Sequence, residues 1–173
     1  MKVGLNMGMF DFLKGKSGNS SSEQTLVSPV NGKVIAIEDV EDPVFSQKMM
    51  GDGFGVEPRD GDIYAPGSGK VVSVFPTQHA VGLELDNGVE VLVHIGIDTV
   101  ELGGAPFDTL VKEGDKVTPD TKISTVDLTA LAEAGKENTV IIVFSNMDQV
   151  ENFELSTTGE TSKGTEIGKI SSK

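Results

Sequence analysis

Short runs of β-branched and other apolar residues, separated by glycine and proline, are the feature that most restricts how this chain can fold. Such runs occupy residues 34–37, 71–75, 89–95 and 140–144. Turn residues return between them about every 8 to 12 positions, a spacing typical of β-sandwiches and β-barrels. We therefore expect an all-β, antiparallel, sandwich-like or barrel-like fold.

Helix is expected only as short turns. One turn is predicted within residues 44–50 and another within residues 148–151. Residues 128–134 form the best short helix, because an apolar periodic stretch is followed by Gly135, a common residue at helix C-termini.

A short motif occurs twice. Residues 28–34 and 65–71 each contain a proline that is followed, after two further residues, by Gly-Lys-Val and the start of a strand. Two similar half-units wrapped around one core would explain the repetition, since short repeats cannot bury a face alone. The alternative is that the motif is common hairpin chemistry without further meaning.

The charge balance excludes some classes of protein. The chain has 173 residues, the size of one domain, and its formal net charge is −13. This acidic excess argues against a nucleic-acid-binding protein and against a protein held on anionic lipid by its whole surface. Cysteine is absent, which excludes disulfides, thiol nucleophiles and Cys-ligated metals.

The first 25 residues differ from the rest. Residues 17–25 are a Ser-rich linker after a short head, 7–14, that mixes methionine, phenylalanine and lysine. The head is either a short amphipathic helix that touches a membrane or a partner, or a leader without stable structure. We expect a flexible segment 1–25 and a single domain 26–173. No apolar run approaches the ~20 residues of a membrane span, and no signal peptide is evident, so a cytoplasmic location is expected.

Both histidines of the chain lie in a predicted β-hairpin. Apolar residues alternate on either side of the turn residues 86–88. A two-residue Asn-Gly turn would pair Leu85 with Glu90 and mix the two faces, whereas a three-residue turn pairs Leu85 with Val89. Register follows the apolar pattern, so we predict the three-residue turn with Gly88 in the left-handed conformation.

This register places the two imidazoles together. It sets Ala80 opposite His94, and His94 faces outward because Val93 and Ile95 face the core. His79 lies one residue before Ala80, at the strand end. Cross-strand and diagonal neighbours are ~4.5–8 Å apart, so we expect His79 and His94 to meet on the surface.

Two adjacent imidazoles allow several kinds of chemistry. They can hold a metal, although two ligands leave a tetrahedral site half filled. They can act as acid and base near neutral pH, or one can attack phosphorus while the other hydrogen-bonds to the phosphoryl oxygens. Thr77 offers a hydroxyl beside them, and Asp98 can accept a ring proton or order the following loop. The remaining alternative is a pairing without function.

Several apolar residues lie in or beside turns, where the demand of the core is weakest. They are Val44, Phe45, Met49, Met50, Phe75 and Val100. If they are exposed together, they form a docking patch for another protein. The alternative is that they are ordinary core residues.

Three stretches of the chain are highly specific for a known family. They read Asp-Pro-Val-Phe-Ser-Gln-Lys-Met-Met-Gly-Asp-Gly at 42–53, Thr-Gln-His-Ala at 77–80, and Val-Leu-Val-His-Ile-Gly-Ile-Asp-Thr-Val-Glu-Leu at 91–102. Together they resemble the glucose-type enzyme IIA of the bacterial phosphoenolpyruvate-dependent sugar phosphotransferase system. The resemblance runs from about Val27 to the C-terminus, and Ser-Asn-Met-Asp at 145–148 is similar to the family's late strand and turn.

The resemblance implies a β-sandwich of two similar halves that acts as a phosphocarrier. Such a protein accepts a phosphoryl group from the carrier protein HPr, passes it to the IIB domain of a sugar permease, and also docks regulatory targets. The resemblance implies that His94 is phosphorylated, with His79 and Thr77 in support. The docking face that it implies, with Asp98 added beside it, consists of Val44, Phe45, Met49, Met50, Phe75, Leu92 and Val100.

The resemblance implies no required cofactor. It allows zinc between His79 and His94 only when a partner adds a carboxylate. A phosphoryl group brings about two negative charges, which on an acidic protein need local donors. We expect these donors to be Thr77, His79 and the backbone N–H groups of residues 95–97.

Two other classes share part of the pattern. A zinc peptidase of similar architecture uses a His-x-His pair with a further His and Asp, and a chain with two histidines falls short of that ligand set. A biotinyl or lipoyl carrier module has hairpins similar to residues 65–71 and 111–117. However, its attachment lysine lies in a Met-Lys-Met or Asp-Lys-Ala turn that this chain lacks.

Overall fold

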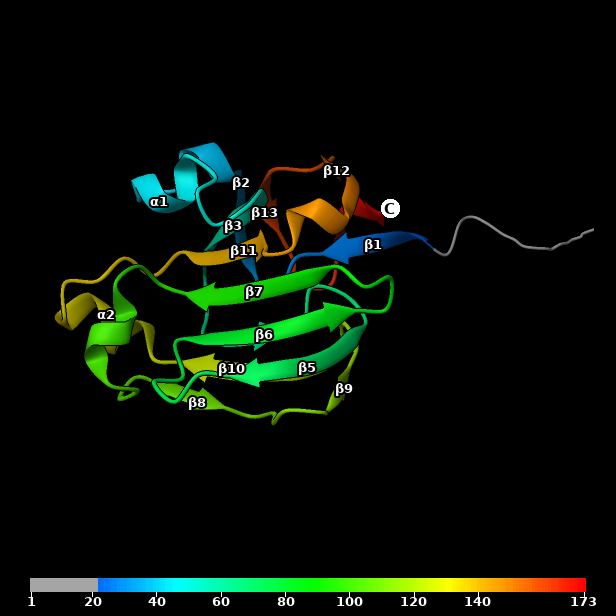
Figure 1. The fold of residues 1–173 in the computed structure, drawn as a ribbon. Helices are drawn as coiled ribbons and strands as arrows, with labels where there is room; N and C mark the ends of the chain where they lie inside the picture. Colours follow the sequence, from blue (N-terminus) through cyan, green and yellow to red (C-terminus); the bar gives the residue numbers. More distant parts are fainter. Residues whose placement is uncertain (1–21) are drawn as a thin grey trace, which may run out of the picture.

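The computed structural model describes residues 22–173, and strands predominate in this part of the chain (Figure 1). The strands are β1 Glu23–Val27, β2 Gly32–Ala36, β3 Gly53–Pro58, β4 Asp62–Tyr64, β5 Gly69–Val74, β6 Ala80–Leu85, β7 Glu90–Ile95, β8 Phe107–Thr109, β9 Lys116–Val117, β10 Lys122–Val126, β11 Val140–Phe144, β12 Val150–Leu155, β13 Gly159–Thr161 and β14 Glu166–Ser172. The helical segments are η3 Ile37–Asp39, α1 Pro43–Ser46, η4 Thr99–Leu102, α2 Leu128–Glu133 and η5 Met147–Gln149. The helical turns predicted from the sequence correspond to α1, α2 and η5. None of the described helices is long and apolar enough to cross a membrane.

The strands form one large and two small sheets. The large sheet has eight strands in the order β13-β2-β3-β11-β7-β6-β5-β9. The small sheets, β1-β14-β12 and β4-β10-β8, have three strands each. Every described strand pair is antiparallel. The prediction of an antiparallel all-β sandwich is therefore confirmed, with open sheets rather than a closed barrel.

The two copies of the repeated motif occupy equivalent places in this fold. The N–H of Val27 donates to the carbonyl of Pro66 at 2.9 Å, and the N–H of Tyr64 donates to the carbonyl of Pro29 at 2.7 Å. The two bonds are equivalent, because the same sequence offset relates Pro29 to Pro66 and Val27 to Tyr64. Each motif then enters a strand, β2 or β5, that lies second from an edge of the large sheet. The two predicted half-units are therefore present.

An approximate two-fold axis relates the half-units and passes between β7 and β11. Val93 faces Ile142 at this point. Moving outward from the axis, β11, β3, β2 and β13 correspond to β7, β6, β5 and β9. The small sheets correspond to each other in the same way, since β14 and β10 are both central strands. Each element of one half-unit can therefore be compared with a counterpart in the other.

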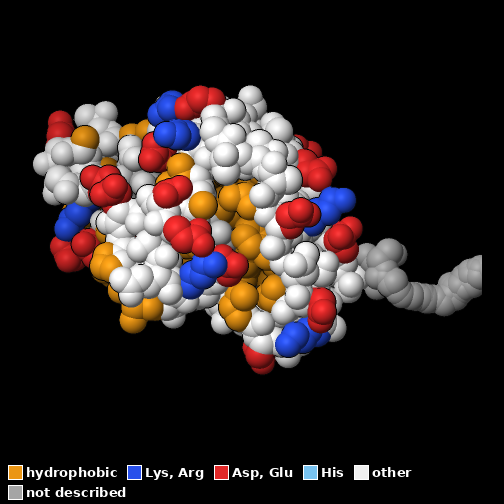
Figure 2. All heavy atoms as spheres, turned by 90° about the horizontal axis from the view of Figure 1, so that it is seen from above, with side chains coloured by type: hydrophobic (Ala, Val, Ile, Leu, Met, Phe, Trp, Pro, Cys, Tyr) orange, Lys and Arg blue, Asp and Glu red, His pale blue; other side chains and the backbone are white. Residues whose placement is uncertain are grey.

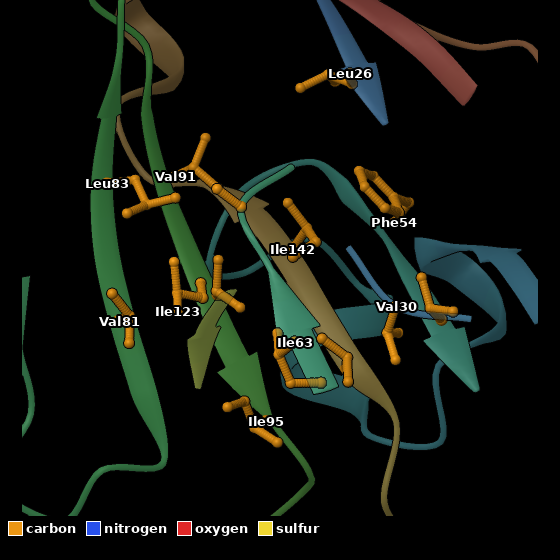
Figure 3. Packing of buried hydrophobic residues seen from close by; sticks show 14 of the residues in the cluster. Leu26, Val30, Phe54, Ile63, Val81, Leu83, Val91, Ile95, Ile123 and Ile142 are labelled. Carbon is orange, nitrogen blue, oxygen red and sulfur yellow. The ribbon is translucent and has the colours of Figure 1, made fainter. Parts of the chain in front are cut away.

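The main core lies between the large sheet and the small sheets. Figure 3 shows Val91 and Ile142 of the large sheet pointing toward Ile63 and Ile123 of the small sheet β4-β10-β8. All four side chains are fully buried. Burial of this kind is the main favourable contribution to folding, at about 25 cal/mol per Å² of apolar area.

A smaller apolar cluster covers the opposite face of the large sheet. It consists of Ile35, Ile37, Val40, Phe45, Ile97, Ile141 and Val143, with Leu92 packed against it. Successive side chains of a strand point to opposite faces, so β11 contributes to both cores, which explains its uninterrupted apolar run. His94 alternates with core residues in β7 and therefore lies on the face of this smaller cluster.

The end of the predicted linker is corrected by the structure. Residues 23–25 belong to β1 and pair with β14. Gln24 anchors this strand, because its Nε2 donates to the carbonyl of Ser68 at 2.7 Å and its Oε1 accepts the N–H of Asn87 at 3.2 Å. A sequence search for buried apolar residues does not detect such polar hydrogen bonds, so it placed the end of the linker too late. The predicted head and residues 17–21 lie outside the described residues.

Candidate functional site

The hairpin of β6 and β7 has the predicted register. Ala80 pairs with His94, and the N–H of Leu85 donates to the carbonyl of Val89 at 2.8 Å across the three-residue turn. Gly88 has a φ of 91°, a left-handed conformation that favours glycine. The alternation of apolar residues therefore sufficed to place the histidines.

His79 and His94 lie in contact at one end of this hairpin. Their ring centroids are 5.0 Å apart, with an angle of 80° between the ring planes. The prediction that they meet is confirmed, but only His94 is partly exposed. His79 is buried, with 8% of its surface exposed, and the ring of Phe75 packs against it with 5.4 Å between the ring centroids. The expectation of two surface imidazoles is thus wrong for His79.

The orientation of His94 is set by a backbone carbonyl. Its Nδ1 lies 2.8 Å from the carbonyl oxygen of Gly96. A carbonyl can only accept a hydrogen bond, so Nδ1 carries the proton and Nε2 of the neutral ring holds the lone pair. The suggestion that Asp98 accepts this ring proton is corrected, since Gly96 does so. Asp98 instead precedes η4 in the left-handed conformation, with a φ of 59°.

Both imidazoles are neutral near pH 7. Burial, together with repulsion from a charged His79, lowers the pKa of His94 to about 4, although the bond to Gly96 and the carboxylates of Asp42 and Asp98 oppose the shift. Burial also lowers the pKa of His79. A neutral His94 with its lone pair on Nε2 is a competent nucleophile.

Thr77 holds the second imidazole. Its hydroxyl oxygen lies 2.6 Å from Nδ1 of His79. When the hydroxyl donates to Nδ1, the ring proton of His79 lies on Nε2, where it is free to donate to an anion. The predicted position of the Thr77 hydroxyl beside His79 is confirmed.

The backbone N–H groups that follow His94 are already engaged. Ile95 donates to the carbonyl of His79 at 2.7 Å, Gly96 to Thr139 at 2.9 Å, and Ile97 to Glu137 at 3.1 Å. The expectation that these groups bind a phosphoryl oxygen is therefore wrong. The carbonyls of Thr139 and Glu137 belong to a segment about 40 positions later in the chain, which β-pattern arguments do not reach.

Most of the predicted docking residues are accessible. Val44, Met49, Met50 and Val100 are exposed, Met49 most of all at 69%, and we call these four the apolar rim. Phe75 and Leu92 are partly buried. The prediction of an exposed docking residue is wrong for Phe45, which is buried with its ring centroid 5.1 Å from that of His94. It supports the imidazole from below rather than offering a docking surface.

Asp42 is a site residue that the sequence arguments missed. Its Oδ1 accepts the N–H of Val44 at 2.8 Å and so caps α1. Its carboxylate also acts on His94, as does that of Asp98. An Asp before Pro at a predicted helical turn is a recognisable N-cap, and this signal could have identified it.

Figure 2 shows acidic side chains spread over the face seen from above, with hydrophobic side chains exposed between them.

The site does not provide a complete metal centre. Within residues 22–173, no group of three or more His, Asp or Glu side chains is arranged to hold a metal ion. Two imidazoles alone leave a tetrahedral zinc site incomplete.

Fold and site together define a class of protein: an antiparallel β-sandwich of two half-units with two contacting, neutral imidazoles, one of them oriented by a backbone carbonyl. Comparisons with known proteins make the class specific. Residues 24–150 match the family described as phosphoenolpyruvate-dependent sugar phosphotransferase system, EIIA 1. The chain belongs to this EIIA family and is a phosphoryl-carrying transferase component of the system.

Individual relatives agree with the family. The chain is 45% identical over 145 residues to the glucose-specific EIIA component of Halalkalibacterium halodurans, with 84% of each protein covered. It is 42% identical over 156 residues to that of Staphylococcus epidermidis, covering 90% of this chain and 94% of the relative. A glucose-specific EIICBA component of Streptococcus pneumoniae is 48% identical over 147 residues, but the chain spans only 20% of its length.

A solved structure agrees as well. The glucose permease IIA from Mycoplasma capricolum superposes with a TM-score of 0.79 at 36% identity, covering 93% of this chain and 99% of that one. The peptidase and carrier-module alternatives receive no support from these comparisons.

Proposed function

We propose that His94 accepts a phosphoryl group from the carrier protein HPr and passes it to the IIB domain of a glucose-family sugar permease. One observation carries this assignment. The hydrogen bond from Nδ1 of His94 to Gly96 leaves Nε2 as the nucleophilic atom of an imidazole that burial keeps neutral.

The transfer is a displacement at phosphorus. The lone pair of Nε2 attacks the phosphorus of the phosphohistidine on HPr, the N–P bond of the donor breaks, and its electron pair returns to the donor imidazole. The proton of His94 stays on Nδ1, hydrogen-bonded to the carbonyl of Gly96, throughout. The same atoms act in reverse when the acceptor side chain of IIB attacks the phosphoryl group on His94. Such reactions depend on positioning and charge stabilisation more than on covalent help from the protein.

His79 is proposed to stabilise the phosphoryl group. The group brings about two negative charges to a protein whose formal net charge is already −13. The contact of the two rings and the 2.6 Å bond to Thr77 support a role for the free N–H of His79 as the donor. Because the amides of residues 95–97 are engaged elsewhere, this donor carries more of the stabilisation than the sequence suggested.

The surroundings of His94 support protein partners. The apolar rim is suited to docking, and Asp42 and Asp98 would attract a basic partner such as a phosphocarrier. The Streptococcus pneumoniae relative, named an EIICBA component, favours IIB as the acceptor. Regulatory proteins would use the same face. We place the exchange in the cytoplasm, since phosphoenolpyruvate, the phosphoryl source named in the family description, is an intracellular metabolite.

Zinc binding is proposed only as a property of a complex. His79 and His94 supply two ligands, and a carboxylate from a docked partner would add a third.

The decisive experiment is labelling from radioactive phosphoenolpyruvate with enzyme I and HPr present. The wild-type protein is expected to incorporate one phosphoryl group per chain, and His94→Ala to lose the label by at least about a thousandfold, because the nucleophile is gone. Circular dichroism checks that the variant is folded. A label that persists on another residue of His94→Ala would overturn the assignment.

A further inference from the structure

We propose that Gln78 is a positioning residue for His79: its side-chain amide fastens the 75–79 loop to the edge of β8 and so keeps the Thr77–His79 pair aligned with His94. This inference rests on the proposed function above and concerns the transfer step in which His79 takes part. It is carried by the backbone of the loop, by one side-chain hydrogen bond and by a comparison of the two half-units.

The backbone of Gln78 is the first observation. Its φ is 58°, in the left-handed region that non-glycine residues rarely adopt. Its N–H donates to the carbonyl of Phe75 at 2.8 Å and closes a tight turn over Pro76 and Thr77. This conformation is sterically unfavourable for a non-glycine residue, so the loop is held there by something outside the turn.

The side chain of Gln78 provides that restraint. Its Oε1 accepts the N–H of Thr109 at 2.9 Å. Thr109 ends β8, which is an edge strand, and β10 lies on its other side. The Oγ1 of Thr109 is buried without a hydrogen-bond partner among the described residues, so loss of Gln78 would leave a second polar atom of the same residue unpaired. The bond therefore ties the 75–79 loop to a strand of another sheet.

The counterpart in the other half-unit shows that the turn itself does not require this side chain. There the N–H of Gly51 donates to the carbonyl of Lys48 at 3.1 Å, as Gln78 does to Phe75. Gly51 is followed by Asp52, whose backbone carbonyl accepts the N–H of Phe144 at 2.9 Å. In the same way, the backbone carbonyl of His79 accepts the N–H of Ile95. In one half-unit a glycine, Gly51, precedes an aspartate. In the other, a glutamine whose side chain is bonded to β8 precedes the imidazole of His79. The difference points to the imidazole as the group that is held.

The consequence concerns geometry at the reacting atoms. His79 is the residue directly after Gln78, and Thr77 the residue directly before it. A loop freed from β8 would let both shift, which weakens the 2.6 Å Thr77–His79 contact and misaligns the N–H that faces the phosphoryl group. Small misplacements of this kind slow transfer by about ten- to a hundredfold.

The test compares Gln78→Gly with a matched control, Gln24→Ala. Glycine suits the left-handed conformation and removes only the side-chain bond. Gln24 also bridges two backbone segments, but at a distance along the chain from both histidines. The measurement is single-turnover transfer from the phosphorylated protein to a IIB domain that the wild-type protein phosphorylates. We expect Gln78→Gly to lower the rate at saturating IIB about tenfold, with an unchanged half-saturation concentration, while Gln24→Ala retains the wild-type rate.

Two readouts separate positioning from a general structural role. The ¹⁵N resonances of the His79 ring should shift toward a mixture of tautomers in Gln78→Gly and remain unchanged in Gln24→Ala. In a His79→Gln background, Gln78→Gly should cause no further slowing, because the group it positions is already absent. Equal slowing in both backgrounds, or a wild-type rate in Gln78→Gly, would overturn the inference. Failure of the wild-type protein to be labelled at His94 would instead overturn the proposed function.

Discussion

The two half-units of this protein share a backbone frame but differ in the side chains at one matched place. The backbone carbonyls of His79 and Asp52 each accept the N–H of the last residue of a central strand. The bond from Ile95 to His79 is 2.7 Å long and that from Phe144 to Asp52 is 2.9 Å long. The counterpart of His94 across the axis is Val143, a residue of the smaller apolar cluster. One half-unit therefore has paired imidazoles where the other has a carboxylate and an apolar side chain.

This comparison separates what the duplicated frame does from what a few residues do. The frame buries the core and presents two strand ends with the same hydrogen bonds. The proposed transfer requires, in addition, the carbonyl of Gly96 to orient one ring and Thr77 to orient the other.

The largest expected effect in this comparison comes from removing the imidazole that the other half-unit lacks. His79→Gln should still be phosphorylated by HPr, because His94 remains, but should transfer to IIB about a hundredfold more slowly, since the imidazole donor is lost. Rapid-quench measurement of transfer from the phosphorylated variant checks this. Transfer at the wild-type rate would remove His79 from the mechanism.

The second prediction tests whether the frame is equivalent in both halves. A Cβ on Gly32 would collide with the carbonyl oxygen of Glu57, and a Cβ on Gly69 with that of Glu84. Gly32→Ala and Gly69→Ala should each lower the free energy of unfolding by about 2–3 kcal/mol, as overpacking against backbone does.

Urea denaturation provides the measurement for both glycine variants. Gly55→Ala is the control, because its Cβ would meet only side chains, at 3.1 Å or more, and should cost less. A difference above about 1.5 kcal/mol between Gly32→Ala and Gly69→Ala would contradict the equivalence of the half-units.

The third prediction concerns pH. The pKa of His94 is lowered to about 4 in the folded protein, whereas an unfolded histidine titrates near 6.5. Between about pH 6.5 and 4 the unfolded state binds more protons, so the free energy of unfolding should fall as the pH falls, by on the order of 1–3 kcal/mol. Above about pH 7 this contribution is fully present.

The pH effect is checked by urea denaturation at several pH values and by NMR titration of the His94 ring. His94→Val, which copies Val143, should reduce the slope of stability against pH in this range, leaving the smaller contribution of His79. A His94 midpoint near 6.5 would contradict the description of a buried, neutral imidazole.

The smallest effect is expected at the acidic residues beside His94. Asp42→Asn keeps an N-cap on α1, because asparagine caps as well as aspartate. It should raise the HPr concentration at half-saturation about two- to fivefold at low salt, the range of an exposed charge interaction, and less at high salt. Asp120→Asn, far along the chain in a polar turn, serves as the control. Equal effects of both variants would mean that only total charge matters.

Alternation of apolar residues predicted the part of the site that lies on regular strands. It set the register of β6 and β7, and hence the contact of His79 with His94. It could not identify which turn residues are covered, because Phe45 and Met49 are both apolar, yet one lies under His94 and the other is exposed. Coverage depends on where α1 packs, which no local pattern contains.

The sequence by itself determined the antiparallel β-fold, the two half-units and the pairing of the two histidines, because period-two patterning and turn residues act over short distances along a chain. Only the tertiary structure decided which atoms of the site are free. Thr139 and Glu137 occupy the amides after His94, and Thr109 binds Gln78. These partners come from segments far apart in sequence, and hydrogen bonds between such segments form only when distant strands pair and the sheets pack together.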